Sequence, residues 1–428
     1  MKRYSEYKDS GVKWIGEIPE HWKCTRIKFI ANLYGRIGFR GYNSKDLNKD
    51  GIGAITLSPS NMKDMMMDYT NVTYLSWEKY NESPEIMIQQ GDILFVKTGS
   101  SYGKSCYVDN LPQEATINPQ ILRINPLING RFLCYYFNSS LARTFTECGV
   151  VGGTIPTISQ EKVGNFIALN PPLPEQEAIV TYLDTKVAKI DEYISIAEKK
   201  IAALEELKQT IIAEAVTRGI HKDVPMKDSG VKWIGMIPEH WKVHKIRSHF
   251  KERRVKVSDK DFQALSVAKI GIVPQLEDAC KTDNGDNRKQ VLKGDFVVNS
   301  RSDRKGSCGI SPLDGSVSLI NIVLRPFNIL QEYVHYLFRS HNYIEEFYRN
   351  GRGIVADLWT TRYSEMRNIQ IPVPPLSEQQ EIVTYIEAKV ANINQLCQAE
   401  RSQIEKLKEY KQRLISDVVT GKVKVTND

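Results

Sequence analysis

Two stretches of the chain carry apolar residues at alternating steps of three and four, and each stretch begins shortly after a P-P-L-x-E-Q sequence. This spacing places the apolar side chains on one face of a helix and is typical of a coiled-coil seam. We therefore predict a helix over residues 178–216 and a matching helix near the C-terminus. The seam residues are Val180, Leu183, Val187, Ile190, Ile194, Ala197, Ile201 and Leu204 in the first helix and Val383, Ile386, Val390, Ile393, Cys397, Ile404 and Leu407 in the second.

The matched register of the two stretches favours helices that pack on each other, with a break where Glu400 takes the phase of Ala197. The alternative is two separate amphipathic helices, each packed on its own module. Two prolines precede each predicted helix, as is common at helix starts. The first turns carry carboxylates that the helix dipole favours, namely Glu175 and Glu177, and Glu378 and Glu381.

Outside these helices the pattern predicts mixed α/β modules. Short runs rich in β-branched and aromatic residues are bounded by Gly, Pro and Asn, as strands usually are. These runs lie at 92–96, 121–124, 295–298 and 320–324. Helical periodicity predicts one helix over 131–146 and one over 331–349.

The chain contains an internal duplication that frames these modules. KDSGVKWIGEIPEHWK at 8–23 recurs at 227–242 with one difference, and PPLPEQEAIVTYLDTKVAKID at 171–191 recurs in related form at 374–394. Between these landmarks only weak similarity survives, such as GDILFV at 91–96 against GDFVVN at 294–299. A shared frame with divergent interiors suits two readers of two different ligand sequences. Drift after an old duplication is the alternative.

The net charge of +7 is concentrated in the modules. Residues 1–170 carry +3 and residues 221–373 carry +7, whereas 171–220 carry −3 and 374–428 carry no net charge. A basic excess confined to two modules indicates a polyanionic partner.

The seven cysteines include no C-x-x-C pair, which argues against a zinc site or a disulfide framework, so we expect them reduced and mostly buried. No apolar run approaches a membrane span and no signal peptide is visible, so we expect a cytoplasmic location.

Signatures of catalysis are missing from the sequence. It has no G-x-x-x-x-G-K-[ST] loop for nucleotide phosphates, and the glycines at 149–153 lack a G-x-G-x-x-G frame. Asn170-Pro171-Pro172-Leu173 lacks the aromatic residue of the adenine-methyltransferase loop, so we interpret it as a structural hinge. We predict no catalytic or metal-binding residue, structural roles for the histidines of the duplicated I-P-E-H-W, and core positions for Trp14, Trp22, Trp233 and Trp241.

Basic and polar residues recur in loops after equivalent strands of both modules. Such side chains can meet guanine edges or phosphate oxygens. The predicted DNA-binding residues are Arg36, Arg40, Tyr42, Lys45, Lys97, Thr98, Ser100, Tyr102 and Lys104 in the first module and Arg253, Arg254, Lys256, Arg301, Ser302, Arg304 and Lys305 in the second.

The duplicated W-I-G-x-I-P-E-H-W segment, the closing P-P-L-x-E-Q stretch and the long helix after it resemble the specificity subunits of type I restriction-modification enzymes. The resemblance covers nearly the whole chain. It implies target-recognition domains at 1–173 and 221–375, conserved spacer helices at 174–220 and 376–422 forming an antiparallel coiled coil, and a tail at 423–428. No T-A-E-L-type spacer repeat is visible.

The resemblance also implies a non-catalytic chain that reads a bipartite, asymmetric double-stranded DNA site. Two modification subunits would bring S-adenosylmethionine and methylate adenine, and restriction subunits would use ATP and Mg²⁺ for translocation and cleavage. No cofactor is expected in this chain. The alternatives are a self-contained DNA methyltransferase and a coiled-coil scaffold protein.

Overall fold

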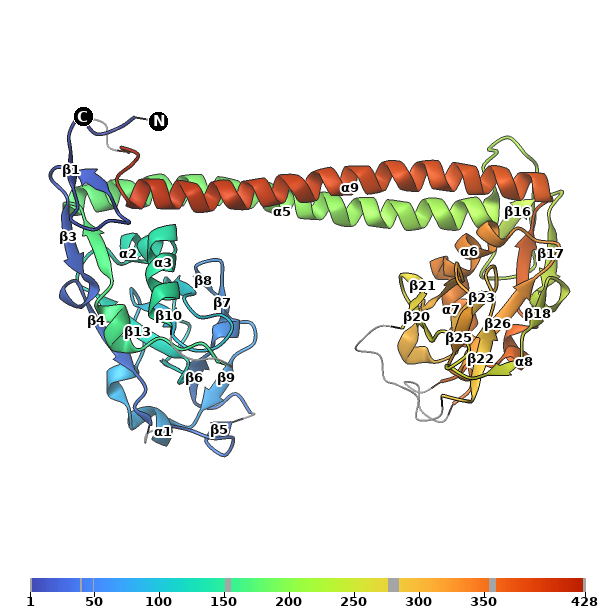
Figure 1. Cartoon of the computed structure of the whole chain (residues 1–428), viewed down its shortest axis with the longest axis horizontal. Coiled ribbons are helices and arrows are strands. Elements are labelled where there is room, and N and C mark those ends of the chain that lie inside the picture. Colours follow the sequence, from blue (N-terminus) through green and yellow to red (C-terminus); the bar gives the residue numbers. More distant parts are fainter. Residues whose placement is uncertain are drawn as a thin grey trace. The chain divides into compact units, whose positions relative to one another are not determined.

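The computed structural model describes residues 2–38, 41–48, 50–150, 155–275, 285–353 and 359–425. The chain divides into two compact units, one formed by Met1–Ile196 with Ser402–Asp428 and one by Ala197–Arg401. Both boundaries between the units fall inside the two longest helices, α5 (Leu173–Arg218) and α9 (Leu376–Val419) (Figure 1). Each unit therefore contains one module with part of both helices.

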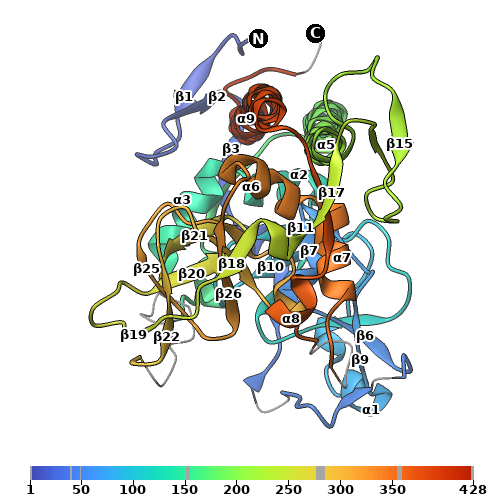
Figure 2. The ribbon, with the colours of Figure 1, turned by 90° about the vertical axis from the view of Figure 1, so that its right-hand side faces the viewer.

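Helices α5 and α9 run antiparallel and pack together, and they lie side by side when viewed nearly end-on (Figure 2). In the second unit Lys208 Nζ donates to Asn394 Oδ1 at 3.2 Å, and in the first unit Lys411 Nζ donates to Asp191 Oδ1 at 2.6 Å. Glu400, where the apolar seam breaks, pairs with Lys200 of the facing helix. At this level an ion pair between the two helices takes the place of an apolar contact.

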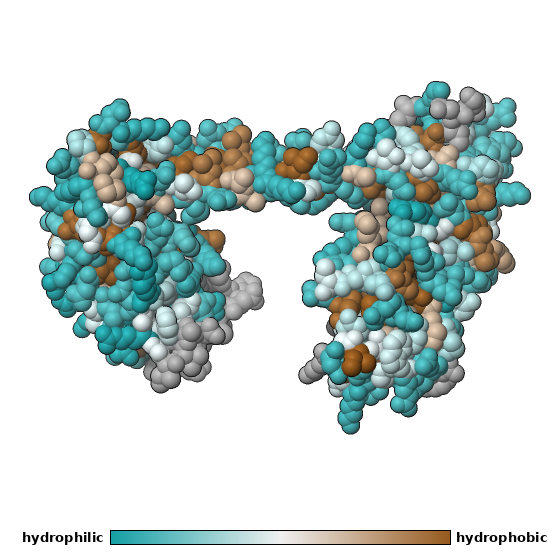
Figure 3. Space-filling model, turned by 180° about the vertical axis from the view of Figure 1, so that it is seen from behind, coloured by the Kyte–Doolittle hydropathy of each residue, from teal (hydrophilic) through white to brown (hydrophobic). Residues whose placement is uncertain are grey.

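The predicted seam residues face inward. Ala197, Cys397 and eight of the aliphatic positions are buried, and Ile194, Ile201, Leu204, Val390 and Leu407 are half-buried. Val180, Leu183, Val187 and Ile190 pack with residues near the end of α9 in the first unit, and Val383 and Ile386 pack with residues near the end of α5 in the second. Other large side chains are exposed on the helix surfaces, namely Tyr193, Ile196, Leu207, Leu396 and Tyr410. Brown patches interrupt the hydrophilic surface of the long helices in Figure 3.

The first module has a four-stranded sheet of order β11-β10-β13-β4 and a second sheet of order β12-β6-β9-β5. Ile93 and Phe95 face helices α2 and α3, whereas Leu94 and Val96 face the second sheet. The central strand is therefore buried on both faces, which explains its uninterrupted apolar sequence. The bounds are β4 Ala31–Gly35, β5 Leu47–Asn48, β6 Ala54–Leu57, β9 Thr73–Leu75, β10 Ile93–Val96, β11 Ser105–Tyr107, β12 Ala115–Ile117, β13 Ile121–Pro126, α2 Gly130–Phe137 and α3 Ser140–Gly149.

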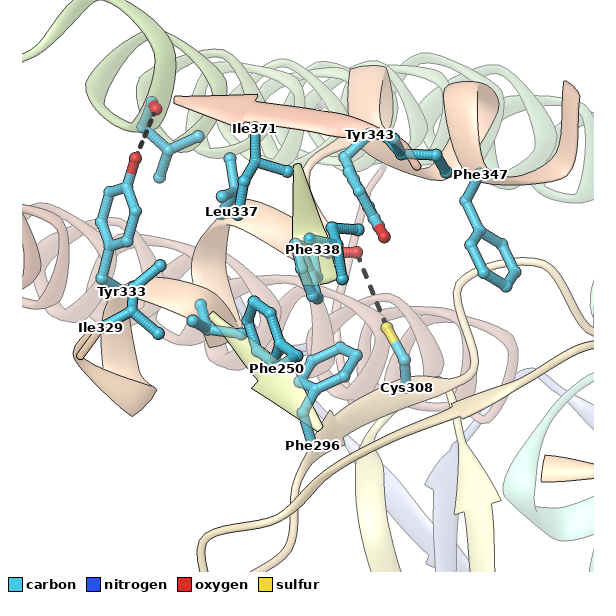
Figure 4. Close-up of a cluster of buried hydrophobic side chains, with 14 of the residues drawn as sticks. Phe250, Phe296, Cys308, Ile329, Tyr333, Leu337, Phe338, Tyr343, Phe347 and Ile371 are labelled. Carbon is cyan, nitrogen blue, oxygen red and sulfur yellow. Dashed lines mark hydrogen bonds between the residues drawn. The ribbon is translucent and has the colours of Figure 1, made fainter. Parts of the chain in front are cut away.

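The second module repeats this layering with sheets of order β18-β26-β23-β24 and β19-β22-β25 under helices α6 and α7. The rings of Phe250 and Phe296 lie 5.2 and 5.0 Å from that of Phe338, which forms the centre of the core in Figure 4. The bounds are β18 Phe250–Glu252, β19 Lys256–Val257, β20 Leu265–Ala268, β21 Gly271–Pro274, β22 Arg288–Val291, β23 Phe296–Asn299, β24 Cys308–Ile310, β25 Gly315–Val317, β26 Asn321–Pro326, α6 Gln331–Arg339 and α7 His341–Arg349.

Smaller elements begin and close each module. A hairpin precedes each module, and a strand after it pairs with the last strand before the long helix. Their bounds are β1 Tyr7–Asp9, β2 Glu17–Pro19, β3 Lys23–Arg26 and β14 Ile167–Asn170 in the first module and β15 Met226–Asp228, β16 Met236–Pro238, β17 Lys242–Lys245 and β27 Gln370–Val373 in the second. The remaining pieces are β7 Met62–Lys63, β8 Met66–Met67, α1 Trp77–Asn81, α4 Gln160–Gly164 and α8 Tyr363–Met366.

Three predictions made from the sequence are wrong in detail. The helices predicted over 131–146 and 331–349 are each two helices, because Ser139 and Ser340 interrupt them and cap the following helix through their hydroxyls. Trp14 is 62% exposed, although Trp22, Trp233 and Trp241 are buried. Trp233 packs on Tyr343 with ring centroids 5.7 Å apart, whereas Trp14 meets the edge of Phe145 at 6.0 Å and remains open to solvent.

The glutamate and glutamine of P-P-L-x-E-Q explain why that sequence is duplicated. Gln176 Nε2 donates to Pro171 O at 2.8 Å, and its Oε1 accepts the Asn129 amide at 3.0 Å, so that it joins the start of α5 to the start of α2. Gln379 makes the equivalent bonds to Pro374 O and from Leu330 N. Glu175 Oε2 accepts from Trp22 Nε1 at 3.0 Å and lies 2.8 Å from His21 Nε2.

We predict that Glu175→Ala destabilises the first unit by about 2 kcal/mol, because it leaves the buried Trp22 N–H without its acceptor. Tyr4, whose hydroxyl also bonds to Glu175, would lose the same acceptor. The measurement is hydrogen exchange of the β3 amides, whose protection should fall.

Glu378→Ala is the matched control in the second unit. Glu378 pairs with His240 at 2.7 Å, but Trp241 Nε1 has no partner among the described residues. Its effect on the β17 amides should be less than half as large. Equal effects of the two substitutions would contradict the role given to the Trp22–Glu175 bond.

Candidate nucleic-acid interface

In both modules the loop that follows the central strand is held against a second loop by main-chain bonds. In the first module Gly99 N donates to Pro156 O at 3.1 Å and Ile158 N donates to Lys97 O at 2.9 Å. In the second module Ser302 N donates to Trp359 O and Thr361 N donates to Ser300 O, both at 2.9 Å. We call residues 97–104 with 155–158, and residues 300–305 with 359–361, the paired loops. They present the candidate DNA-binding side chains on a rigid base.

The second-module paired loops are anchored further by helix α7. The buried Tyr348 hydroxyl lies 3.1 Å from Asn299 O and 3.3 Å from Arg304 O, and donates toward both carbonyls across the turn. Ser300 Oγ donates to Ile320 O on the neighbouring strand connection. The loop backbone therefore has few free torsions, which favours a defined orientation of the side chains it carries.

Three of the four predicted residues in this loop are exposed. Arg301 is 45% exposed with Nε 3.1 Å from Asp303 Oδ1, and Arg304 is 67% exposed. Lys305 pairs with Glu345 at 3.1 Å. Ser302 points inward, where its hydroxyl has no partner among the described residues.

The paired loops of the first module are more polar and less charged. Ser100 is exposed, whereas Lys97, Thr98, Tyr102 and Lys104 are half-buried. Burial lowers the pKa of Lys97. Residues 100–104 line a polar cleft of about 510 Å³ together with Arg143, Thr146 and Glu147 of α3. The cleft has hydroxyl and cationic groups suited to phosphate or base edges.

Two of the predicted DNA-binding arginines make structural contacts inside their modules. Arg36 is only 6% exposed, and its guanidinium donates to Ile117 O and Thr116 Oγ1. These bonds link the end of β4 to β12. Arg253 forms a two-pronged bond to the buried Asp295, with Nε 2.6 Å from Oδ2, and this bond raises the Arg253 pKa. Arg40 lies outside the described residues.

The remaining predicted residues lie nearer the surface. Arg254 and Lys256 are exposed, with Arg254 paired to Glu252, and Lys45 is exposed in the turn before β5. Tyr42 is half-buried and lies over Arg36.

The catalytic alternatives gain nothing from the structure. Asn170 Oδ1 accepts from Gln176 Nε2 at 3.0 Å, which is a structural bond at the hinge before α5. Within the described ranges no group of three or more His, Cys, Asp or Glu side chains could hold a metal ion. No helix in that part of the chain is long and apolar enough to cross a membrane.

The six described cysteines are free, with Cys106, Cys134, Cys308 and Cys397 buried, Cys24 half-buried and Cys148 exposed; Cys280 lies outside the described ranges.

Comparison with known families identifies this arrangement. The family model described as "Type I restriction modification DNA specificity domain" matches the chain twice, over residues 19–206 and 240–406. The chain belongs to this family.

Specificity subunits are among the relatives that align with nearly the whole chain. It is 25% identical to the putative type I restriction enzyme MjaX specificity subunit of Methanocaldococcus jannaschii, over 98% of both chains. The fold is similar to a chain in a structure of type I R-M system assembly (TM-score 0.66, 16% identity, 95% and 99% covered). It is also similar to the HsdS subunit from Thermoanaerobacter tengcongensis (TM-score 0.50, 16% identity, 95% and 98% covered).

Within this family frame, the structure adds basic residues that the sequence analysis missed. Arg362 and Lys289 line a cleft of about 490 Å³ beside Ser300, Arg301 and Thr360 of the second-module paired loops. Lys289 Nζ donates to Asn321 O at 2.7 Å, and burial lowers its pKa. Arg362 lies two residues after Thr360, which bridges Arg301, and only the tertiary pairing of the two loops brings it to this cleft.

We predict that Tyr348→Phe loosens the second-module paired loops, because two carbonyls lose the hydroxyl that bridges them. The hydroxyl has one proton to donate, and the hydrogen bond it shares between the two carbonyls contributes about 0.5–1.5 kcal/mol. Hydrogen exchange over residues 300–305 should quicken and DNA affinity should fall, while the core amides of β23 and β26 stay protected.

Tyr343→Phe on the same helix is the control. Its buried hydroxyl has no partner in the described part of the chain, so its removal should leave the loop exchange unchanged. Unchanged exchange in Tyr348→Phe as well would show that Tyr348 does not anchor the loop.

Proposed function

We propose that this chain is the DNA-reading subunit of a type I restriction-modification complex and that each module reads one half of a bipartite, asymmetric site. The observation that carries the proposal is the pair of equivalent paired loops, which share a main-chain frame and differ in side chains. Thr98 of the first module stands where the second has Arg301. Two modules with the same loop backbone pairing and different loop side chains are suited to binding two different half-site sequences.

Charge supports DNA as the partner. The two modules carry the whole net positive charge of the chain, and the second-module paired loops carry exposed Arg301, Arg304 and Lys305. Lysine and arginine side chains on such a surface neutralise phosphates and give salt-dependent binding. The chemistry of methylation and cleavage is proposed to lie in other chains, since the chain has no sequence signature of a cofactor loop.

The proposed partners are two modification subunits, which bring S-adenosylmethionine and methylate adenine, and restriction subunits, which use ATP and Mg²⁺. The chain itself would hold no cofactor. The assembly would act in the cytoplasm, where it meets double-stranded DNA.

The first test is methyl transfer. We predict that the purified chain alone incorporates no labelled methyl groups into DNA, and that the chain together with its modification subunits methylates adenine in both halves of a split motif. Methyl transfer by the chain free of partners would contradict the non-catalytic assignment. Absence of salt-dependent DNA binding in the assembled complex would contradict the reading role.

The second test concerns the two long helices, which we propose set the spacing between half-sites. Because Lys200 pairs with Glu400, seven residues inserted after each of these positions lengthen both helices at the same level and keep the apolar phase. Each helix gains about 10 Å. Methylome sequencing should then show a longer spacer between unchanged half-site sequences. An active complex with an unchanged spacer would contradict this role of the helices.

A further inference from the structure

Arg301 is held in a way that suits recognition of a base edge. Its backbone is fixed on both sides, because Ser302 N and Ser300 O bond to the second loop, and Arg301 N donates to Asn299 Oδ1 at 3.1 Å. A side chain on such a base loses little further backbone entropy on binding, so that its orientation can contribute to specificity.

The guanidinium of Arg301 is oriented by a neighbouring carboxylate. Asp303 Oδ1 accepts from Nε at 3.1 Å, and the terminal nitrogens make no bond to any described residue. The side chain is therefore held from one side and keeps two parallel donors for a ligand. Two parallel N–H donors match the O6 and N7 acceptors of guanine in the major groove.

The close carboxylate and the aliphatic neighbours of Arg301 favour a base edge over a phosphate as its ligand. Asp303 lies 3.1 Å from Arg301 Nε and 3.8 Å from Arg304 Nε, so the carboxylate offsets the charge of Arg301 more than that of Arg304 and disfavours a phosphate mainly at Arg301. The adjoining cleft contains the cations Lys289 and Arg362, and beside them it exposes Leu319 and Ile320, which are 39% and 45% exposed. Aliphatic side chains can contact base edges and thymine methyl groups but offer nothing to a phosphate oxygen.

The equivalent position of the first module has different chemistry. Thr98 bridges Thr157 as Arg301 bridges Thr360, so the two side chains start from the same place on the frame. Threonine has a hydroxyl and a methyl group but no fork of donors. Guanine recognition at this position is therefore expected of the second module and not of the first.

We propose that Arg301 reads one guanine of the half-site bound by the second module, with Asp303 orienting its guanidinium. Arg304 lacks the close Asp303 contact and is more exposed, so it contacts backbone phosphate and contributes affinity without base preference. This proposal rests on the proposed function and extends it to the base that one side chain recognises.

The experiment is methylome sequencing of a host that carries the complete complex with wild-type chain, Arg301→Gln or Arg304→Gln. Glutamine pairs with adenine through its amide. Arg301→Gln should therefore change one obligatory guanine to adenine, or relax it, by roughly 5- to 150-fold in preference, with the other half-site unchanged. Arg304→Gln is the matched control and should lower methylation evenly across motifs without changing their sequence.

Several results would overturn the proposal. They are a wild-type motif without an obligatory G·C pair in either half, a change at a position that is not guanine, and an unchanged motif in an active Arg301→Gln complex. If Arg301→Gln abolishes methylation, Arg301→Lys decides, because lysine keeps the charge but lacks the fork. A relaxed guanine position then supports the proposal and an unaltered motif overturns it.

Failure of the proposed function is a distinct outcome. In that case the wild-type complex itself would leave no methylated bipartite motif. A wild-type motif that persists unchanged in the Arg301 variants would remove only the guanine assignment.

Discussion

The buried glutamate and glutamine at the start of each long helix connect the parts of each unit. Glu175 accepts a hydrogen bond from the indole N–H of Trp22, which lies between β2 and β3. Gln176 accepts one from the Asn129 amide at the start of α2. Buried polar groups are costly unless bonded, so each partner constrains the other's position. The helix direction, the leading hairpin and the module helices are thereby fixed together. This constraint explains why the W-I-G-x-I-P-E-H-W and P-P-L-x-E-Q sequences are the ones duplicated.

The same principle operates inside the modules, but the residues that satisfy it come from different strands. The buried Asp92 accepts from Arg123 on β13, and its counterpart Asp295 accepts from Arg253, which follows β18. In the first module the neighbour of Arg123 is Tyr34, the counterpart of Arg253. The carboxylate keeps a guanidinium partner although neither strand keeps its sequence. Divergence of the module interior is therefore compatible with one frame.

This frame leaves the paired loops free to vary. Their backbones are joined by main-chain bonds that do not depend on side-chain identity, so Thr98 and Arg301 can occupy equivalent places. The chemistry of the loop surface can therefore differ between the two modules without loss of the core beneath it, because the bonds that hold the core are made by Asp92, Asp295 and the strands.

The sequence alone determined the features that depend on local pattern. Apolar residues spaced alternately three and four positions apart specified the seam between α5 and α9. The internal duplication specified two modules, and short apolar runs located β10 and β23. It also placed basic side chains in the loops after these strands. These features follow from periodicity and chain order, which a single sequence contains.

Only the tertiary structure decided which polar residues are inside. Arg36 and Arg253 look like Arg301 in sequence, but their guanidinium groups bond to Thr116 and Asp295, residues distant along the chain. Likewise Trp14 and Trp233 share one sequence context, but Trp233 packs on Tyr343 and is buried, whereas Trp14 contacts Phe145 and remains exposed. Burial and hydrogen bonding depend on contacts between distant segments, and local sequence does not specify those contacts.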